Sequence, residues 1–212
     1  MTPRIRLACL LCIALGLSLG IAPRVHAAGP MAIKDGDRVV FYGDSITDQR
    51  LYTTFVETYI VTRFPSWRVT FVHSGWGGDR VTGGGGGPID RRLQRDVFAY
   101  NPTVVTVMLG MNDAAYQPFK QAIFDVYARG YQHLVESLKS HLEGVRITLL
   151  EPSPFDDVTR KPRFEGGYNQ VLIRYGEFVK GLGDKEGALV ADLNTPLVVA
   201  LKKAMAIDPP AM

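Results

Sequence analysis

Residues 103–109 read Thr-Val-Val-Thr-Val-Met-Leu, a near-continuous apolar run. Such a run is typical of a strand buried on both faces, which occurs in parallel sheets covered by helices. Strand-like and helix-like segments alternate along the whole chain. Strands are predicted over 39–42, 69–72, 103–109, 145–150 and 188–192, and helices over 53–64, 89–99, 125–141, 167–182 and 196–206. This alternation predicts an α/β fold, a three-layer α/β/α sandwich around a parallel sheet.

The first 27 residues have the pattern of a secretory signal peptide. Arg4 and Arg6 precede an apolar stretch, and Val25-His26-Ala27 ends in a small residue. The apolar stretch is about 15 residues long, shorter than the ~20 needed to cross a bilayer. We therefore expect cleavage near Ala27, a secreted or periplasmic protein without a stable membrane span, and a single domain over 28–212.

Removing that segment changes the composition of the chain. Both cysteines, Cys9 and Cys12, lie in it, so the remainder has no disulfide and no thiol chemistry. Three of the 24 Lys and Arg residues also lie in it, which leaves the rest nearly balanced against 21 acidic residues. The excess of basic residues in the full chain is thus no argument for binding nucleic acid, and we expect no nucleic-acid partner.

Three polar, glycine-containing segments follow three of the predicted strands. They are 43–45 (Gly-Asp-Ser), 73–79 (His-Ser-Gly-Trp-Gly-Gly-Asp) and 110–113 (Gly-Met-Asn-Asp). Because ligands bind at the carboxyl ends of the strands in open α/β sheets, the three segments are expected to meet at one site. Each segment alone fits a simpler role, as a turn or a helix cap. Their occurrence together, in this order, favours a catalytic site.

Ser45 is the candidate nucleophile, since it lies where a strand passes into a helix. Its own N–H, the N–H of Gly78 and the side-chain amide of Asn112 are candidates for an oxyanion hole, which stabilises the charge that develops in acyl transfer. Asp44, Trp76 and Tyr116 are the candidate substrate-binding residues. Trp76 suits stacking on a sugar ring, lining an acyl pocket, or simply closing the core.

The blocks GDSITD (43–48), HSGWGGD (73–79) and GMND (110–113) resemble blocks I to III of the SGNH hydrolases, also called the GDSL esterase/lipase family. The resemblance implies a flavodoxin-like sandwich and hydrolysis of carboxylic esters through an acyl-enzyme on Ser45, with Ser45, Gly78 and Asn112 as oxyanion-hole residues. It implies no cofactor and no metal. Acetylated carbohydrates and lysophospholipid-type acyl esters both remain open as substrates, and the oligomeric state is open too.

The sequence departs from the family's pattern in two places. His73 stands where the family often has Asn in block II, and we expect it to follow a strand and hold the loop by hydrogen bonds. The family's Asp-x-x-His block, which supplies the general base, is missing from this sequence. His133 and His141 share one predicted helix and are expected at its surface. We therefore expect a C-terminally truncated chain that hydrolyses esters poorly on its own, with the base outside it.

If the base has been lost, the alternative is a non-catalytic carbohydrate-binding protein on the same fold.

The tract Gly83–Gly87 lacks the Lys-Ser/Thr that follows a phosphate-binding P-loop. It is expected to form a flexible loop beside the active site.

Overall fold

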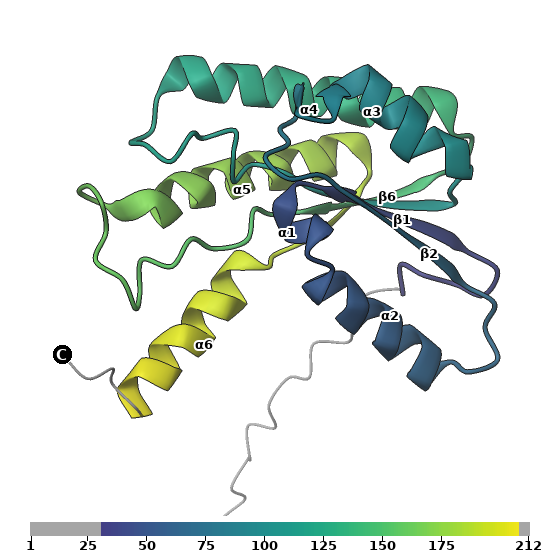
Figure 1. Cartoon of the computed structure of the whole chain (residues 1–212), viewed down its shortest axis with the longest axis horizontal. Helices are drawn as coiled ribbons and strands as arrows, with labels where there is room; N and C mark the ends of the chain where they lie inside the picture. The colour runs from purple at the N-terminus through teal and green to yellow at the C-terminus, as the bar shows by residue number, and fades with distance from the viewer. Residues whose placement is uncertain (1–30, 208–212) are drawn as a thin grey trace, which may run out of the picture. The chain divides into compact units, whose positions relative to one another are not determined.

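A computed structural model of the chain describes residues 31–207, and the predicted signal peptide lies outside them. The sheet has five parallel strands in the order β2-β1-β5-β6-β7, with helices on both sides (Figure 1). Its strands are β1 (Arg38–Gly43), β2 (Thr70–Gly75), β5 (Val104–Met108), β6 (Arg146–Leu150) and β7 (Leu189–Ala191). The predicted α/β fold class is confirmed, and all five predicted strands are present.

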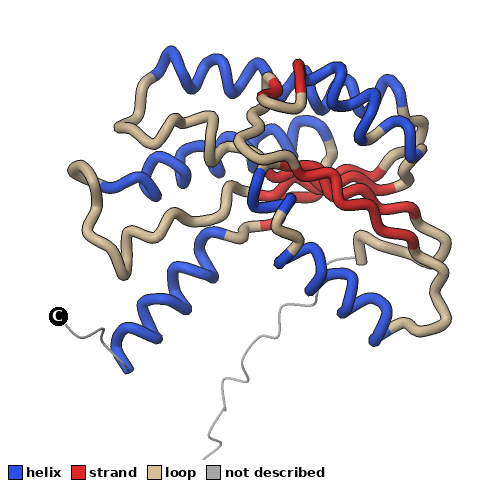
Figure 2. The backbone as a smooth tube through the Cα atoms, viewed as in Figure 1, coloured by secondary structure: helices blue, strands red, loops and turns tan. Residues whose placement is uncertain are grey.

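The central strand β5 and its neighbour β1 are the most buried, as their apolar composition predicts. In β5, Val104, Val105 and Val107 have no exposed surface, and in β1 only Arg38 is exposed. Parallel pairing sets Gly43 at the end of β1 beside Met108 at the end of β5. The carboxyl ends of both strands therefore meet at the same edge of the sheet, where the polar segments follow. Figure 2 shows the strands as one layer with helices above and below it.

One face of the sheet is covered by α3 (Ile89–Asp96), α4 (Gln121–His141) and α5 (Gly167–Glu186). The core on this face contains apolar side chains of α4 and α5 at helical spacing, which is why these segments are helices. Its fully buried members include Tyr127, Tyr131, Leu134, Leu138, Leu172 and Val179. We call this side the closed face.

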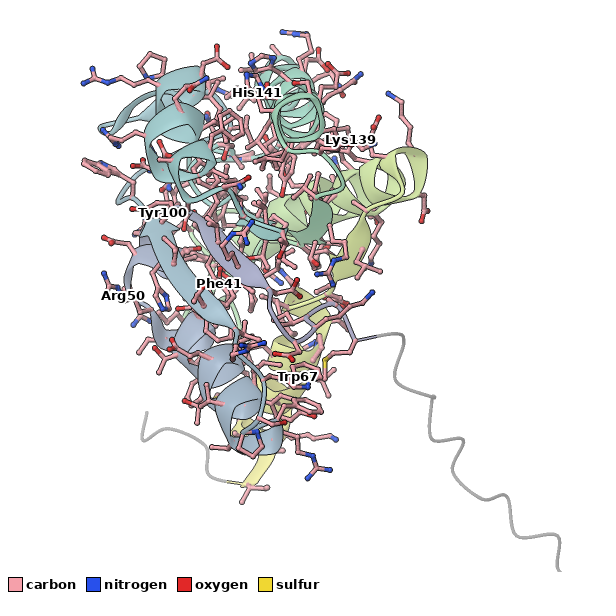
Figure 3. All side chains as sticks on the ribbon, turned by 90° about the vertical axis from the view of Figure 1, so that its right-hand side faces the viewer. Phe41, Arg50, Trp67, Tyr100, Lys139 and His141 are labelled. Atoms are coloured by element: carbon pink, nitrogen blue, oxygen red, sulfur yellow. The ribbon has the colours of Figure 1, made fainter. Side chains whose placement is uncertain are left out.

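The other face carries α2 (Leu51–Arg63) and α6 (Asn194–Ile207). Its core is smaller and consists of Ile33, Val39, Phe41, Ile60 and Val104, with partly buried residues of α2 around it. In α6 only Asn194 is buried. Figure 3 shows Phe41 in the strand layer, with Trp67 on the side of α2 and His141 on the side of α4. We call the side of α2 and α6 the open face.

The stretch from 83 to 100 differs from the prediction in two places. The helix expected over 89–99 ends at Asp96, and a short 3-10 helix follows at Phe98–Tyr100, because Val97 leaves helical geometry at φ −128° and ψ −63°. The glycine tract forms a small antiparallel hairpin of β3 (Gly83–Gly84) and β4 (Gly87–Pro88) instead of an irregular loop. A side chain at Gly83 would lie within 2.7 Å of Ile89 N, so the tract is tightly packed.

Across residues 31–207, every helix is too short or too polar to cross a membrane.

Candidate active site

Ser45 is the first residue of α1 (Ser45–Asp48), which begins directly where β1 ends. Asp44 caps this helix, and its Oδ1 accepts a hydrogen bond from Ile46 N at 2.9 Å. Glycine is required at 43, since a Cβ there would collide with Thr47 Oγ1 and lie 2.7 Å from Met108 O. The tight junction leaves Ser45 half-buried at the carboxyl edge of the sheet.

Gly78 lies in a tight turn after β2. Asp79 N donates to Trp76 O at 3.1 Å, and Gly78, the third residue of the turn, has φ +74°. A positive φ at that position alone is the mark of a type II turn, which favours glycine. In such a turn the central peptide, here Gly77–Gly78, is flipped relative to a type I turn. The conformation of Gly78 therefore decides which way its N–H points.

Asn112 joins the three polar segments. Its Nδ2 donates to Asp79 O at 2.9 Å and, with a longer bond of 3.4 Å, to Asp44 Oδ2. Its Oδ1 accepts from the Tyr116 hydroxyl at 3.2 Å. The segments after β1, β2 and β5 thus meet through one side-chain amide, as the sequence predicts for the carboxyl edge of the sheet.

Asp44, the third candidate substrate-binding residue, is buried behind the edge of the sheet. It is 1% exposed, and its carboxylate is engaged by Ile46 N and Asn112 Nδ2. Burial, followed by repulsion from Asp79, raises the pKa of Asp44 to about 6, against the opposing Ile46 N–H. The carboxylate thus holds α1 and Asn112 in place, and its contact with substrate stays a prediction.

The two aromatic candidates lie at the surface. Trp76 is 40% exposed and Tyr116 is 42% exposed. Ala115 and Tyr116 both adopt the left-handed conformation, at φ +57° and +53°, which costs about 1 kcal/mol or more per residue. The Tyr116 ring stacks on Tyr168 at 4.9 Å between centroids, and this contact helps to hold the loop in that conformation.

Arg92 is a residue that the sequence reading missed. It belongs to α3 and has only 1% of its surface exposed. Its Nε donates to Asp79 Oδ2 at 2.9 Å, and its Nη1 bonds Asp96. Burial raises the pKa of the Asp79 carboxyl, and the Arg92 guanidinium opposes that rise. The helical spacing of Ile89, Arg92 and Leu93 gave a signal, because it sets all three on one buried stripe.

His73 does not hold the loop after β2. It lies within β2, where Nδ1 is 2.8 Å from Thr53 Oγ1 and Nε2 is 3.3 Å from Glu57 Oε2, both residues of α2. The expectation was wrong because β2 continues three residues beyond the predicted strand, to Gly75. His73 therefore ties the edge strand to α2.

The other two histidines of the described chain lie at the surface, as expected. His133 is 2.7 Å from Asp90, and His141 stacks on Phe98. Among residues 31–207, every described histidine is thus engaged away from Ser45. The same residues contain no cluster of three His, Cys, Asp or Glu side chains that could hold a metal ion.

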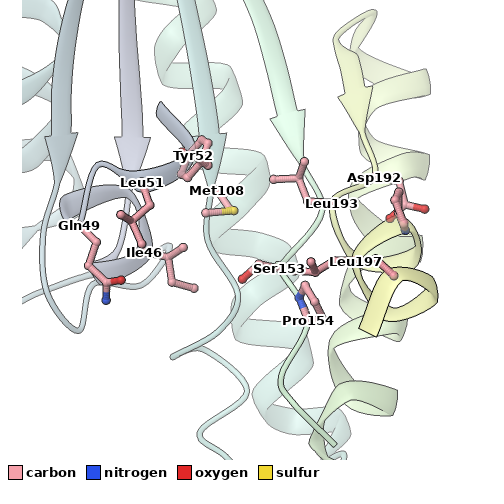
Figure 4. A pocket seen from close by; sticks show the side chains of 12 residues that line it. Ile46, Gln49, Leu51, Tyr52, Met108, Ser153, Pro154, Asp192, Leu193 and Leu197 are labelled. Atoms are coloured by element: carbon pink, nitrogen blue, oxygen red, sulfur yellow. The ribbon is translucent and has the colours of Figure 1, made fainter. Parts of the chain in front are cut away.

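An apolar groove lies on the open face. Its cavity volume is about 510 Å³, and Ile46, Tyr52, Met108, Pro154, Leu193 and Leu197 are among its lining residues. Figure 4 shows side chains from α1, the start of α2, the end of β5, the segments that follow β6 and β7, and α6 around this groove. Ile46 directly follows Ser45 in the sequence and is one of the residues that line the groove, whereas Ser45 itself does not line it.

The GDSL-like Lipase/Acylhydrolase family matches residues 41–208, and the chain belongs to this family. An acetylxylan esterase from Geobacillus stearothermophilus is 25% identical over 193 residues, which are 81% of this chain and 83% of the relative. The family match and the similarity to this esterase together identify the chain as an ester hydrolase.

Solved structures agree on the fold. A gut microbial diltiazem-metabolizing enzyme matches with a TM-score of 0.72 and 29% identity over 85% of this chain, which spans only 42% of that enzyme. Axe2, an acetylxylan esterase from Geobacillus stearothermophilus, has a TM-score of 0.64 and 23% identity, and 83% of each chain is covered. A GDSL-like lipase from Parabacteroides merdae has a TM-score of 0.68 and 19% identity, with 82% of this chain and 85% of the other covered.

Proposed function

We propose that this protein removes acetyl or other short acyl groups from carbohydrates through an acyl-enzyme on Ser45. The observation that carries the proposal is the meeting of three segments through Asn112, whose amide bonds both Asp44 and Asp79. The similarity to an acetylxylan esterase favours an acetylated sugar. Two aromatic side chains near the site are exposed: Trp76 lies in the segment 73–79, and Tyr116 follows the segment 110–113. Their rings offer apolar surface to a sugar ring.

In the proposed reaction, Ser45 Oγ attacks the ester carbonyl carbon. The negative charge that forms on the carbonyl oxygen is stabilised by the N–H groups of Ser45 and Gly78 and by Asn112 Nδ2. Of the two hydrogen bonds that Asn112 Nδ2 donates, the one to Asp44 Oδ2 is the longer, at 3.4 Å. In the proposed reaction the N–H of this weaker bond leaves Asp44 and donates to the substrate oxygen, since breaking it costs less free energy than breaking the bond to Asp79 O.

The serine proton must pass to a base and then to the departing alcohol. We assign this role to a histidine outside the described residues, as the resemblance implies, because those described bond elsewhere. Loss of the alcohol leaves an acyl-enzyme, which water attacks to give the carboxylic acid and free Ser45. Without the base, only the part of catalysis that comes from the oxyanion hole and binding would remain.

The test uses the full-length natural protein with p-nitrophenyl acetate and acetylated xylo-oligosaccharide. We expect turnover of both, and Ser45→Ala should reduce kcat by about 10⁴-fold or more, as removal of a nucleophile does. Ser140→Ala is the matched control, because Ser140 is exposed in the last turn of α4, and it should keep wild-type turnover. Binding of the sugar with no turnover would refute the esterase and support the non-catalytic alternative.

A longer acyl group, as in a lysophospholipid, is a second candidate substrate. The observation that favours it is the apolar groove of about 510 Å³ that starts at Ile46. A series of p-nitrophenyl esters from acetate to octanoate separates the two. A kcat/KM that rises with chain length would favour the lipid-like ester, and one that is highest for acetate would favour the acetylated carbohydrate.

We also propose that the protein acts outside the cytoplasm, on the basis of the signal-like residues 1–27. Expression of the full chain followed by N-terminal sequencing tests this. A mature N-terminus near Ala28 in the periplasm or medium is expected, and an uncleaved protein in the cytoplasm would contradict it.

A further inference from the structure

We propose that Arg92 positions the oxyanion hole by anchoring Asp79, the residue that connects the Gly78 turn to Asn112. The inference rests on the proposed function. Arg92 is almost completely buried, so it acts through its neighbours and does not contact substrate.

The first step of the argument is the contact between Arg92 and the strand ends. Its Nη2 donates to Ser74 O at 3.2 Å and to Gly43 O at 3.5 Å. Gly43 O also accepts from Trp76 N at 3.0 Å. One guanidinium therefore connects the end of β1, which precedes Ser45, with the end of β2, which precedes the Gly78 turn.

The second step is the double attachment of Asp79. Its carboxylate accepts from Arg92 Nε at 2.9 Å, while its main-chain oxygen accepts from Asn112 Nδ2 at 2.9 Å. Gly78 is bonded directly to it. A shift of Asp79 would thus move two of the three proposed oxyanion donors at once, and misplacement by about 1 Å can reduce catalysis about 100-fold.

The third step is the packing that leaves Arg92 little room. Its guanidinium carbon lies 4.8 Å from the centre of the Tyr42 ring and 5.5 Å from that of Trp76. Gly86 covers it, since a Cβ there would lie 2.6 Å from Arg92 Cδ and 2.9 Å from the Trp76 ring. Glycine is therefore needed at position 86, because a larger residue would collide with Arg92 where the chain passes over it.

Arginine suits this position better than lysine. Its planar group donates in several fixed directions, whereas an ammonium is a single point charge. Arg92 uses this geometry on the Asp79 carboxylate and on two main-chain oxygens. Arg92→Lys should keep the ion pair with Asp79 but lose the simultaneous contacts with Gly43 and Ser74.

The experiment compares two variants of the full-length protein. One is Arg92→Lys, and the other is the double variant Asp79→Asn with Arg92→Met, which removes both charges of this buried pair. Asp96, the second partner of Arg92, keeps its ion pair with Arg95 in the double variant. Arg91, exposed on the same helix, is changed to Lys and to Met as the matched control. The readouts are kcat and KM for p-nitrophenyl acetate, and the NMR signals of the Gly78 amide and the Asn112 side-chain amide.

We expect both variants to fold. Arg92→Lys should lower kcat by about 10- to 100-fold. The double variant should lower kcat by about 10²- to 10³-fold, which is the range seen when one oxyanion donor is lost. KM should stay within about threefold, since a transition-state contact is removed and not ground-state binding. The Gly78 and Asn112 signals should shift in both variants and remain in place in the Arg91 controls.

A purely structural role for Arg92 gives a different result. Folded variants with wild-type kcat and unshifted Gly78 and Asn112 signals would overturn the proposal. If the double variant fails to fold, Arg92→Lys decides by the same two readouts. If the wild-type protein hydrolyses no ester, the proposed function fails, whereas the two amide signals still report whether Arg92 holds the turn and Asn112.

Discussion

The two faces of the sheet are built differently, although the same five strands contribute to both. On the closed face, three helices bury a continuous set of aromatic and aliphatic side chains, including Tyr127, Tyr131 and Leu134. On the open face, α2 and α6 leave an apolar groove, and large side chains such as Phe55 and Leu197 are exposed. The comparison teaches that the closed face carries the buried contacts of Arg92 with the strand ends, whereas the open face keeps apolar surface accessible at the groove.

The largest expected effect comes from removing core volume on the closed face. Leu134→Ala should lower the free energy of unfolding by about 2–5 kcal/mol, because Leu134 is fully buried and its loss leaves a cavity. Urea unfolding measures the change. Leu197→Ala on α6, where the side chain is 48% exposed, is the control and should stay within about 0.5 kcal/mol. Equal losses in both variants would break the distinction between the faces.

A second prediction concerns the buried Asp113, whose Oδ1 accepts from Val81 N. Burial, with repulsion from Asp44, raises its pKa from 3.8 to about 7. As the pH rises from about 4 to 7, the unfolded chain loses this proton before the folded protein does, so stability falls. Each unit of pKa difference contributes about 1.4 kcal/mol. Asp113→Asn has no proton to lose, and its stability should fall less over this range.

Urea unfolding at about pH 4.5 and about pH 7.5 measures this difference for the wild type and Asp113→Asn. The exposed Asp184 in α5 provides the matched control, and Asp184→Asn should keep the pH dependence of the wild type. An unchanged pH dependence in Asp113→Asn would show that Asp113 is ionised in the folded protein throughout the range.

The smallest effect is expected on the open face. Leu51→Ser and Leu197→Ser, both in the groove, should change the free energy of unfolding by no more than about 0.5 kcal/mol. They should nevertheless weaken the fluorescence of a bound apolar dye such as ANS, because they reduce the exposed apolar surface. Val126→Ser, at an exposed position of α4, is the control. A stability loss of several kcal/mol in the groove variants would mean that this face is packed.

The sequence predicted the sheet, its helices and the meeting of three segments because these follow from apolar periodicity and from the geometry of parallel strands. It failed for His73, since the end of a strand depends on pairing with its neighbour, and β2 follows β1 as far as Gly75. It also missed Arg92, because a helix reading Ile-Asp-Arg-Arg-Leu-Gln-Arg-Asp is mostly charged. Only the tertiary contact with Asp79 shows why this arginine is buried.

The space around Gly43 has a consequence for how this chain tolerates mutation. A Cβ at this position would collide with Thr47 Oγ1 and crowd Met108 O, and every other amino acid carries that atom. Any missense change in this codon therefore disturbs the backbone that leads into Ser45, whatever the chemistry of the new side chain. At Gly77 a Cβ would meet nothing within 4 Å, so a methyl group fits there without a clash. Two glycines of one site thus differ completely in the steric room that they leave for a mutation.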